Sequence, residues 1–159
     1  MQSLNAEDQL FILMQAGLYL ISTRGYSAQE ARICYERVES LCSSLNRPLL
    51  RYTALMGQWR YSLVTDKVTA TMQIARRVYS VAQQGNDSAL MMEAYQALAV
   101  PLYFLGDFEA ARQYARQGVQ VCHGGVQSRV DEAAAHAVSC LMWAALTAWH
   151  FGEDRKSVV

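Results

Sequence analysis

The sequence predicts an all-α protein, a right-handed solenoid of antiparallel helix pairs with about seven helices. Only two prolines and nine glycines interrupt the 159 residues, and strong helix formers are abundant throughout. No convincing run alternates apolar and polar residues, as a half-buried strand would. Similar turn residues recur about every forty residues, and a period of this length is typical of stacked helical repeats.

The expected helices share apolar positions that recur three and four residues apart. Their expected ranges are about 5–23, 28–44, 49–64, 67–84, 88–105, 108–122 and 130–151. Ser27 and Glu30 match a capping box, which would start the second helix. Pro48 stands in the first turn of the third helix, where its missing amide costs nothing. Pro101 lies inside the fifth helix, where it removes one backbone bond and predicts a kink.

The turns divide one domain, 1–159, into repeated units. Comparable turns fall at Gly25, Thr65, Gly106 and Gly152. The expected units are about 5–45, 47–85 and 87–123, followed by a half unit at 130–152. The third unit matches the tetratricopeptide pattern best. Its matching positions are Tyr95, Leu98, Ala99, Leu102, Gly106, Asp107, Phe108, Ala111, Ala115 and Gly118. The small residues among them allow the two helices of a unit to approach closely.

Several stretches resemble one family more closely. They are residues 24–30, 35–37, 57–59 with Tyr61, 97–98 and 102–111. Together they are similar to the tetratricopeptide-like region of bacterial multidomain signalling ATPases fused to adenylate/guanylate cyclase, Ser/Thr kinase or winged-helix regulator domains. The resemblance covers about residues 10–152 and implies a sensor or docking arm. No phosphate-binding loop, kinase motif or cyclase motif occurs in the sequence. The half unit leaves open whether the chain is a fragment or a complete gene product.

Charge and cysteine usage exclude several classes of partner. Fourteen Lys and Arg balance fourteen Asp and Glu, so no basic surplus favours nucleic acid or an anionic membrane surface. The apolar stretch 133–149 is shorter than a membrane-spanning helix requires. The four cysteines, Cys34, Cys42, Cys122 and Cys140, form no CxxC motif. Reduced, mostly buried thiols in a cytoplasmic protein are therefore expected.

The first helix of each unit is expected to line the concave face. The positions projected there form an aromatic, mostly uncharged groove. They are Tyr52, Leu55, Trp59, Glu93, Gln96, Val100, Tyr103, Ser139, Met142, Leu146 and Trp149. Such a groove suits an apolar or helical protein segment better than an acidic peptide tail, which would need Lys or Arg. The alternative is that these side chains pack in the core and that the register is off by one.

The sequence gives little support for a metal site or for a catalytic cysteine. Glu132, His136 and Cys140 are spaced at i, i+4 and i+8, which places the outer two about 12 Å apart, too far for one zinc ion. Cys122 and His123 lie near them in sequence, but no local motif marks a nucleophile with its base. The arginines Arg76, Arg77, Arg112 and Arg116 are expected to be solvated or paired with Glu109 and Asp66.

The sequence therefore predicts a non-catalytic domain for protein–protein interaction or regulation in a bacterial signalling or transcription-regulatory system, without a cofactor. The alternative is a sensor that binds a small apolar or aromatic effector on the concave face. An enclosed pocket around Trp59, Tyr103 and Trp149 would favour the sensor. A cysteine/histidine enzyme ranks third. Helix 130–151 is apolar on all sides, so we expect it to pack against a second copy or against further domains of a longer protein.

Overall fold

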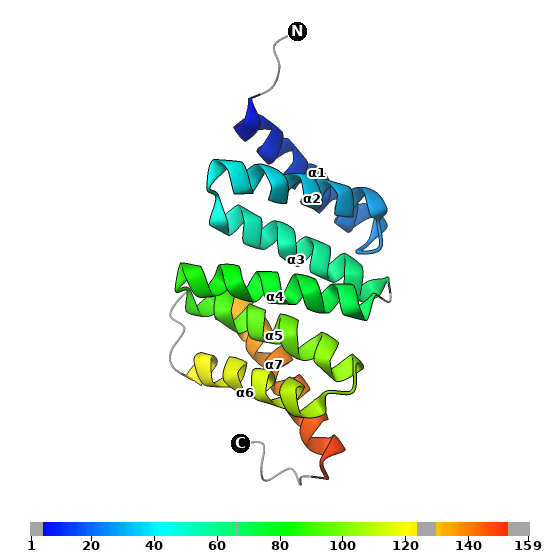
Figure 1. Ribbon diagram of the computed structural model, residues 1–159, viewed down its shortest axis with the longest axis vertical. Helices are drawn as coiled ribbons and strands as arrows, with labels where there is room; N and C mark the ends of the chain where they lie inside the picture. The colour runs from blue at the N-terminus through cyan, green and yellow to red at the C-terminus, as the bar shows by residue number, and fades with distance from the viewer. Residues whose placement is uncertain (1–4, 66, 124–129, 153–159) are drawn as a thin grey trace. The chain divides into compact units, whose positions relative to one another are not determined.

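The structure is a computed structural model that describes residues 5–65, 67–123 and 130–152, with the backbone alone for 122–123 and 130–136. Every regular element in these ranges is an α-helix (Figure 1). The helices are α1 (Ala6–Arg24), α2 (Gln29–Leu45), α3 (Pro48–Val64), α4 (Val68–Gly85), α5 (Ser88–Phe104), α6 (Phe108–His123) and α7 (Val130–His150). Each end lies within one residue of its expected position, so the all-α prediction is confirmed.

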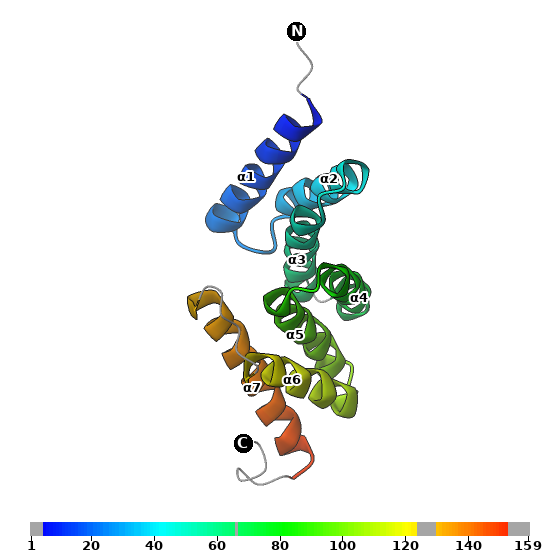
Figure 2. The same cartoon turned by 90° about the vertical axis from the view of Figure 1, so that its left-hand side faces the viewer.

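The chain divides into two compact units, Met1–Val81 and Ala82–Val159. In the first unit, α2 packs against both α1 and α3. In the second unit, α5, α6 and α7 pack against one another, and Figure 2 shows α7 lying along α5 and α6. The repeat boundaries, the single domain and the handedness of the solenoid stay predictions.

Capping side chains or a proline stand at the start of several helices. The side chain of Asn5 accepts a hydrogen bond from the amide of Asp8 at 2.7 Å. Asp87 caps α5 in the same way through its bonds to the amides of the first turn, which satisfies donors that have no intrahelical partner. Pro48 occupies the first turn of α3, as predicted.

The predicted capping box at the start of α2 is wrong. The helix begins at Gln29 with Ala28 as its N-cap, and no side chain caps it. The amide of Ala28 bonds the carbonyl of Gly25 at 3.3 Å, and this tight turn leaves Ser27 outside the capping position. The carboxylate of Glu30 instead accepts from Arg24 at 2.5 Å.

Residues with positive φ angles stand at several turns between helices. Gly25, Gly106 and Gly152 have φ values of 82°, 81° and 68°, a conformation that glycine adopts without a steric penalty. These are three of the four turns that the sequence predicts as repeat boundaries. Asn46 and Asn86 are also left-handed, with φ values of 51° and 49°, as asparagine tolerates. They stand forty residues apart, which equals the predicted repeat period.

Two glycines shape the core of the first unit around one aromatic ring. Tyr35 on α2 is 3% exposed. A Cβ atom added to Gly57 on α3 would lie 2.5 Å from this ring, and one added to Gly17 on α1 would lie 3.0 Å from it. Because neither glycine has a side chain, α1 and α3 can both pack directly on Tyr35.

Small residues hold the second unit together, as the sequence predicts. Ala99, Ala111 and Ala115 are fully buried, and Ala99 and Ala115 form one cluster with Ala144 of α7. A Cβ atom at Gly118 would collide with the sulfur of Cys140. These contacts fix which face of α7 turns towards α5 and α6.

Candidate functional site

One face of α7 exposes apolar side chains along the helix. The members of this α7 stripe are Val138, Leu141, Met142, Ala145 and Trp149. Counted from Val138, the other four members follow at three, four, seven and eleven residues. This spacing places all five within an arc of about 100° around the helix axis. Trp149 is 73% exposed and Val138 is 64% exposed. An exposed apolar surface of this kind marks an interaction site more often than an isolated apolar residue does.

The α7 stripe overlaps the predicted groove residues of the fourth unit, with a shift of one residue at two positions. Met142 and Trp149 lie within it, whereas Leu146 is half-buried. Val138 takes the place expected for Ser139, and Ala145 takes the place expected for Leu146. A register error of one residue was part of the alternative given above for the predicted groove.

The projected exposure is wrong at four positions on α3 and α5. Tyr52, Leu55, Trp59 and Val100 are buried, at 2%, 0%, 5% and 2% exposed. The physical reason is that the apolar stripe of a helix is usually its packing face. Three further predicted groove residues, Glu93, Gln96 and Tyr103, are half-buried. A partner-binding role for the residues that keep some exposure stays a prediction.

Tyr103 is the centre of an aromatic cluster that joins α5 to α7. The cluster comprises Tyr103, Phe104, Phe108, Trp143 and His150. The Tyr103 ring centroid lies 5.2 Å from that of Trp143, and its hydroxyl hydrogen-bonds His150 Nε2 at 2.9 Å. The imidazole of His150 also stacks on Phe108, with centroids 4.0 Å apart. Tyr103 therefore orders this end of the second unit.

The aromatic cluster extends the apolar surface of the α7 stripe. The ring of Trp149 lies 5.3 Å from that of His150, measured between centroids. Phe104, Leu105 and Phe151 are each about half exposed, at 58%, 51% and 45%. The groove projected from the sequence does not include these residues: Leu105 and Phe151 lie in the turns, and Phe104 is not at a projected position of α5.

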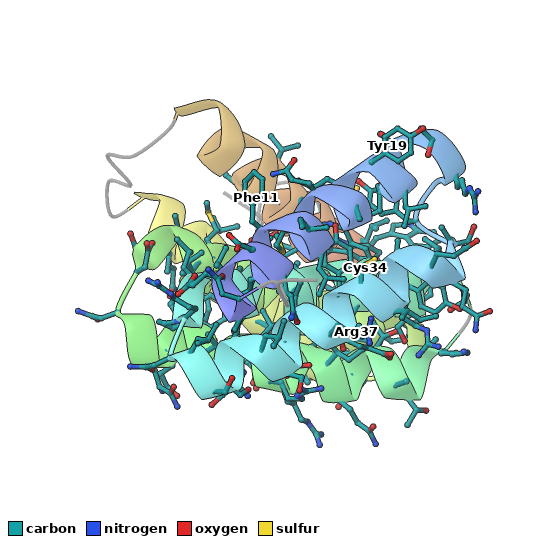
Figure 3. All side chains as sticks on the ribbon, turned by 90° about the horizontal axis from the view of Figure 1, so that it is seen from above. Phe11, Tyr19, Cys34 and Arg37 are labelled. Carbon is teal, nitrogen blue, oxygen red and sulfur yellow. The ribbon has the colours of Figure 1, made fainter. Side chains whose placement is uncertain are left out.

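The first unit has an exposed apolar face of its own, on α1. Phe11, Leu18 and Tyr19 are 66%, 51% and 67% exposed, and Figure 3 shows Phe11 and Tyr19 projecting from the same side of the helix. This face also lies outside the groove projected from the sequence. Moving Tyr52 and Trp59 back by forty-one residues gives Phe11 and Leu18, but Tyr52 and Trp59 are themselves buried, so the repeat period alone does not predict an exposed face here.

Cys34 and Cys42 lie in surroundings that disfavour a reactive thiolate. Cys42 and Cys140 are buried and Cys34 is half-buried. Burial raises the pKa of the Cys34 thiol, and this effect is larger than the opposing attraction of Arg37, which lies one turn further along α2 (Figure 3). Burial raises the pKa of Cys42 too. The nucleophilic form of cysteine is the thiolate, and both environments disfavour it.

Three further predictions concern metals, membranes and arginines. Among the side chains that the structure describes, no cluster of three metal-ligating groups occurs. Four residues considered as ligands or nucleophile partners lie outside that set: Cys122, His123, Glu132 and His136. No described helix combines the length and apolarity needed to cross a bilayer. The pairing of Arg112 with Glu109 is confirmed at 2.7 Å, whereas Arg77 pairs with Glu39.

Comparison with solved structures identifies the architecture. The chain is similar to the crystal structure of the TPR domain of Arabidopsis FLU (FLU-TPR), with a TM-score of 0.68 and 18% sequence identity, over 76% of this chain and 100% of that chain. The chain has a tetratricopeptide-like repeat fold. No protein-family model and no curated protein matches it. At this identity the likeness shows the fold alone, so the function must be argued from the surface.

Proposed function

We propose that the protein is a non-catalytic protein-interaction repeat domain, and that the α7 stripe is its docking surface. The exposed fraction of this stripe is the observation that supports the proposal. No Asp, Glu, Lys or Arg occurs from residue 133 to residue 149. A charged partner surface would lose its hydration against this face without gaining an ion pair. The partner surface is therefore an uncharged, apolar face of a helix.

The occupant that this chemistry fits best is the α7 helix of a second copy. The stripe runs from Val138 to Trp149, twelve residues and about 17 Å along the helix, and two such stripes can pair antiparallel about a two-fold axis. Because the stripe carries no charge, pairing it with itself brings no like charges together. Phe104, Leu105 and Phe151 of the second unit are also about half exposed, and a stable interface that included them would bury more apolar area.

The proposal also includes a biological role. The resemblance of residues 24–30 and 102–111 to bacterial signalling ATPases supports a regulatory docking role in the cytoplasm, with an output domain either fused or separate. The sensor alternative depends on Trp59 in the first unit and on Tyr103 and Trp149 in the second. It stays a prediction.

Sedimentation equilibrium of the full chain tests the second copy as occupant. We expect the wild-type chain to dimerise at micromolar concentration. Leu141→Lys places a charge in the middle of the stripe and should yield a monomer. Leu49→Lys makes the same change at a residue of α3 that is 61% exposed, and this matched control should dimerise like the wild type.

Two outcomes would contradict the proposal. A wild-type chain that is monomeric at these concentrations excludes the second copy. Equal effects of Leu141→Lys and Leu49→Lys would show that any added charge weakens association, so the α7 stripe would not be the interface. Circular dichroism of each variant establishes that the helices remain folded.

A further inference from the structure

A cavity in the first unit lies among α2, α3 and α4. It has a volume of about 220 Å³. Arg32 and Glu36 line it from α2, and Tyr61 and Ser62 line it from α3. Lys67, immediately before α4, completes the polar part of its wall. The cavity is smaller than the roughly 300–1,000 Å³ of sites that enclose a whole drug-sized ligand, so its size fits one functional group.

Two cations share one aromatic ring in this cavity. The guanidinium carbon of Arg32 lies 5.5 Å from the ring centroid of Tyr61. The ammonium nitrogen of Lys67 lies 5.7 Å from the same centroid. Each cation is attracted to the ring, but the arrangement holds two positive charges within about 11 Å of each other, where they repel.

Only part of this positive charge is compensated. Glu36 accepts from Arg32 at 2.5 Å, which satisfies one of the two cations. Among the described residues, no carboxylate forms an ion pair with Lys67. Its ammonium group instead lies over the ring of Tyr61. The lining groups thus carry a net charge of about one positive unit, located at Lys67.

The wall also contains a buried hydroxyl. Ser62 is 4% exposed, and its hydroxyl donates to the carbonyl of Lys67 over 3.4 Å. This distance is at the long end for an O–H···O bond, so little energy is lost when the hydroxyl turns to another acceptor. Gln58, the other buried polar residue of the wall, already donates to Glu39 at 3.0 Å. Ser62 is therefore the neutral donor that remains for a ligand.

We propose that this cavity binds a single anionic group, a phosphate or a carboxylate, through Lys67, Arg32 and Ser62. The anion neutralises the excess charge beside Tyr61 and accepts charge-assisted hydrogen bonds from Lys67 and the hydroxyl. The apolar side of the wall, Ala70 and Ile74, accommodates the carbon to which the group is attached. This site is in the first unit and does not depend on the α7 stripe, so either proposal can fail alone.

Nuclear magnetic resonance titration of the full chain tests the site. Sodium phosphate and sodium acetate are added in separate titrations, with sodium chloride at equal ionic strength as reference. We expect saturable shifts at the backbone amides of Ser62 and Lys67, and the salt that binds more tightly identifies the source of the anion. Lys67→Gln should weaken binding about tenfold, as expected for the loss of one charged contact. Lys67 is exposed, so this variant retains the fold.

Arg76→Gln is the matched control, because it removes one positive charge from an exposed position on α4 that does not line the cavity. Binding by this variant should equal that of the wild type. Shifts that do not saturate, or that match those caused by sodium chloride, overturn the proposal. An equal loss in Arg76→Gln and Lys67→Gln also overturns it, because the effect would then come from the net charge of the chain.

Discussion

Replacing Gly57 with alanine should destabilise the first unit, although the same change usually stabilises a helix. The added Cβ would lie 2.5 Å from two carbons of the Tyr35 ring, about 1 Å short of a favourable carbon–carbon separation. The ring is 3% exposed. It cannot retreat freely, because Gly17 and α1 already contact it from the other side.

The magnitude follows from two opposing effects. Alanine gains about 1 kcal/mol over glycine in a helix interior. Overpacking a core by a methyl group costs about 1–3 kcal/mol, and the upper part of this range applies because Tyr35 is enclosed on two sides. The net loss should be about 1–2 kcal/mol. For a unit of this size, each kcal/mol lowers the melting temperature by about 4–8 °C.

Urea unfolding followed by circular dichroism measures the effect in a ranked series. Gly57→Ala should be least stable. Gly17→Ala should lose less, because its Cβ would lie 3.0 Å from the ring. Gly85→Ala is the control, since an added Cβ there meets nothing within 4 Å, and it should be neutral or slightly stabilising. In a Tyr35→Leu background, the cost of Gly57→Ala should fall.

An unchanged or raised stability in Gly57→Ala would refute this reasoning. It would show that Tyr35 has room to move, and that the close approach of α2 and α3 does not depend on glycine. A loss that persists in the Tyr35→Leu background would place the collision elsewhere.

Three further predictions concern other buried groups. Gly118→Ala should cost about 1–3 kcal/mol by overpacking, and Cys140→Ala should restore most of it, as measured by urea unfolding. Glu39→Ala removes the acceptor of buried Gln58 and of Arg77 and should cost about 2 kcal/mol; a neutral result would mean that water replaces the carboxylate. Cys42, with its raised pKa, should react with a thiol reagent more slowly than unfolded chain at neutral pH, and rapid labelling in site-resolved mass spectrometry would contradict the assignment.

The sequence was sufficient for the helices because each boundary is a local property. Gly25 and Gly106 supply the left-handed turn residues, and Asp87 supplies a cap, all within a few residues of the boundary they define. The predicted cap at Ser27 failed because its outcome depended on the turn from Gly25 to Ala28, a geometry that residue types alone do not determine.

The candidate sites were harder to predict because exposure depends on packing between helices. Leu55 and Met142 occupy equivalent repeat positions, yet one is 0% exposed and the other 47%. No periodicity distinguishes them, since both lie on an apolar face. The cavity beside Tyr61 was missed for a similar reason: Arg32, Tyr61 and Lys67 come from three segments whose proximity arises only when the helices pack.

The packing of α7 allows folding and binding to be separated experimentally. Cys140, Ala144 and Ala148 are buried at 0%, 5% and 2% exposure, so larger side chains there disturb the second unit itself. The α7 stripe lies beside this face. Leu141 is 44% exposed, so a substitution there disturbs the packing of the second unit less than one at Ala144, and surface changes usually cost less than about 0.5 kcal/mol. A loss of association at Leu141 with unchanged unfolding therefore measures the interface, whereas a change at Ala144 measures both. This difference makes the exposed face of α7 the place to test what the repeat binds.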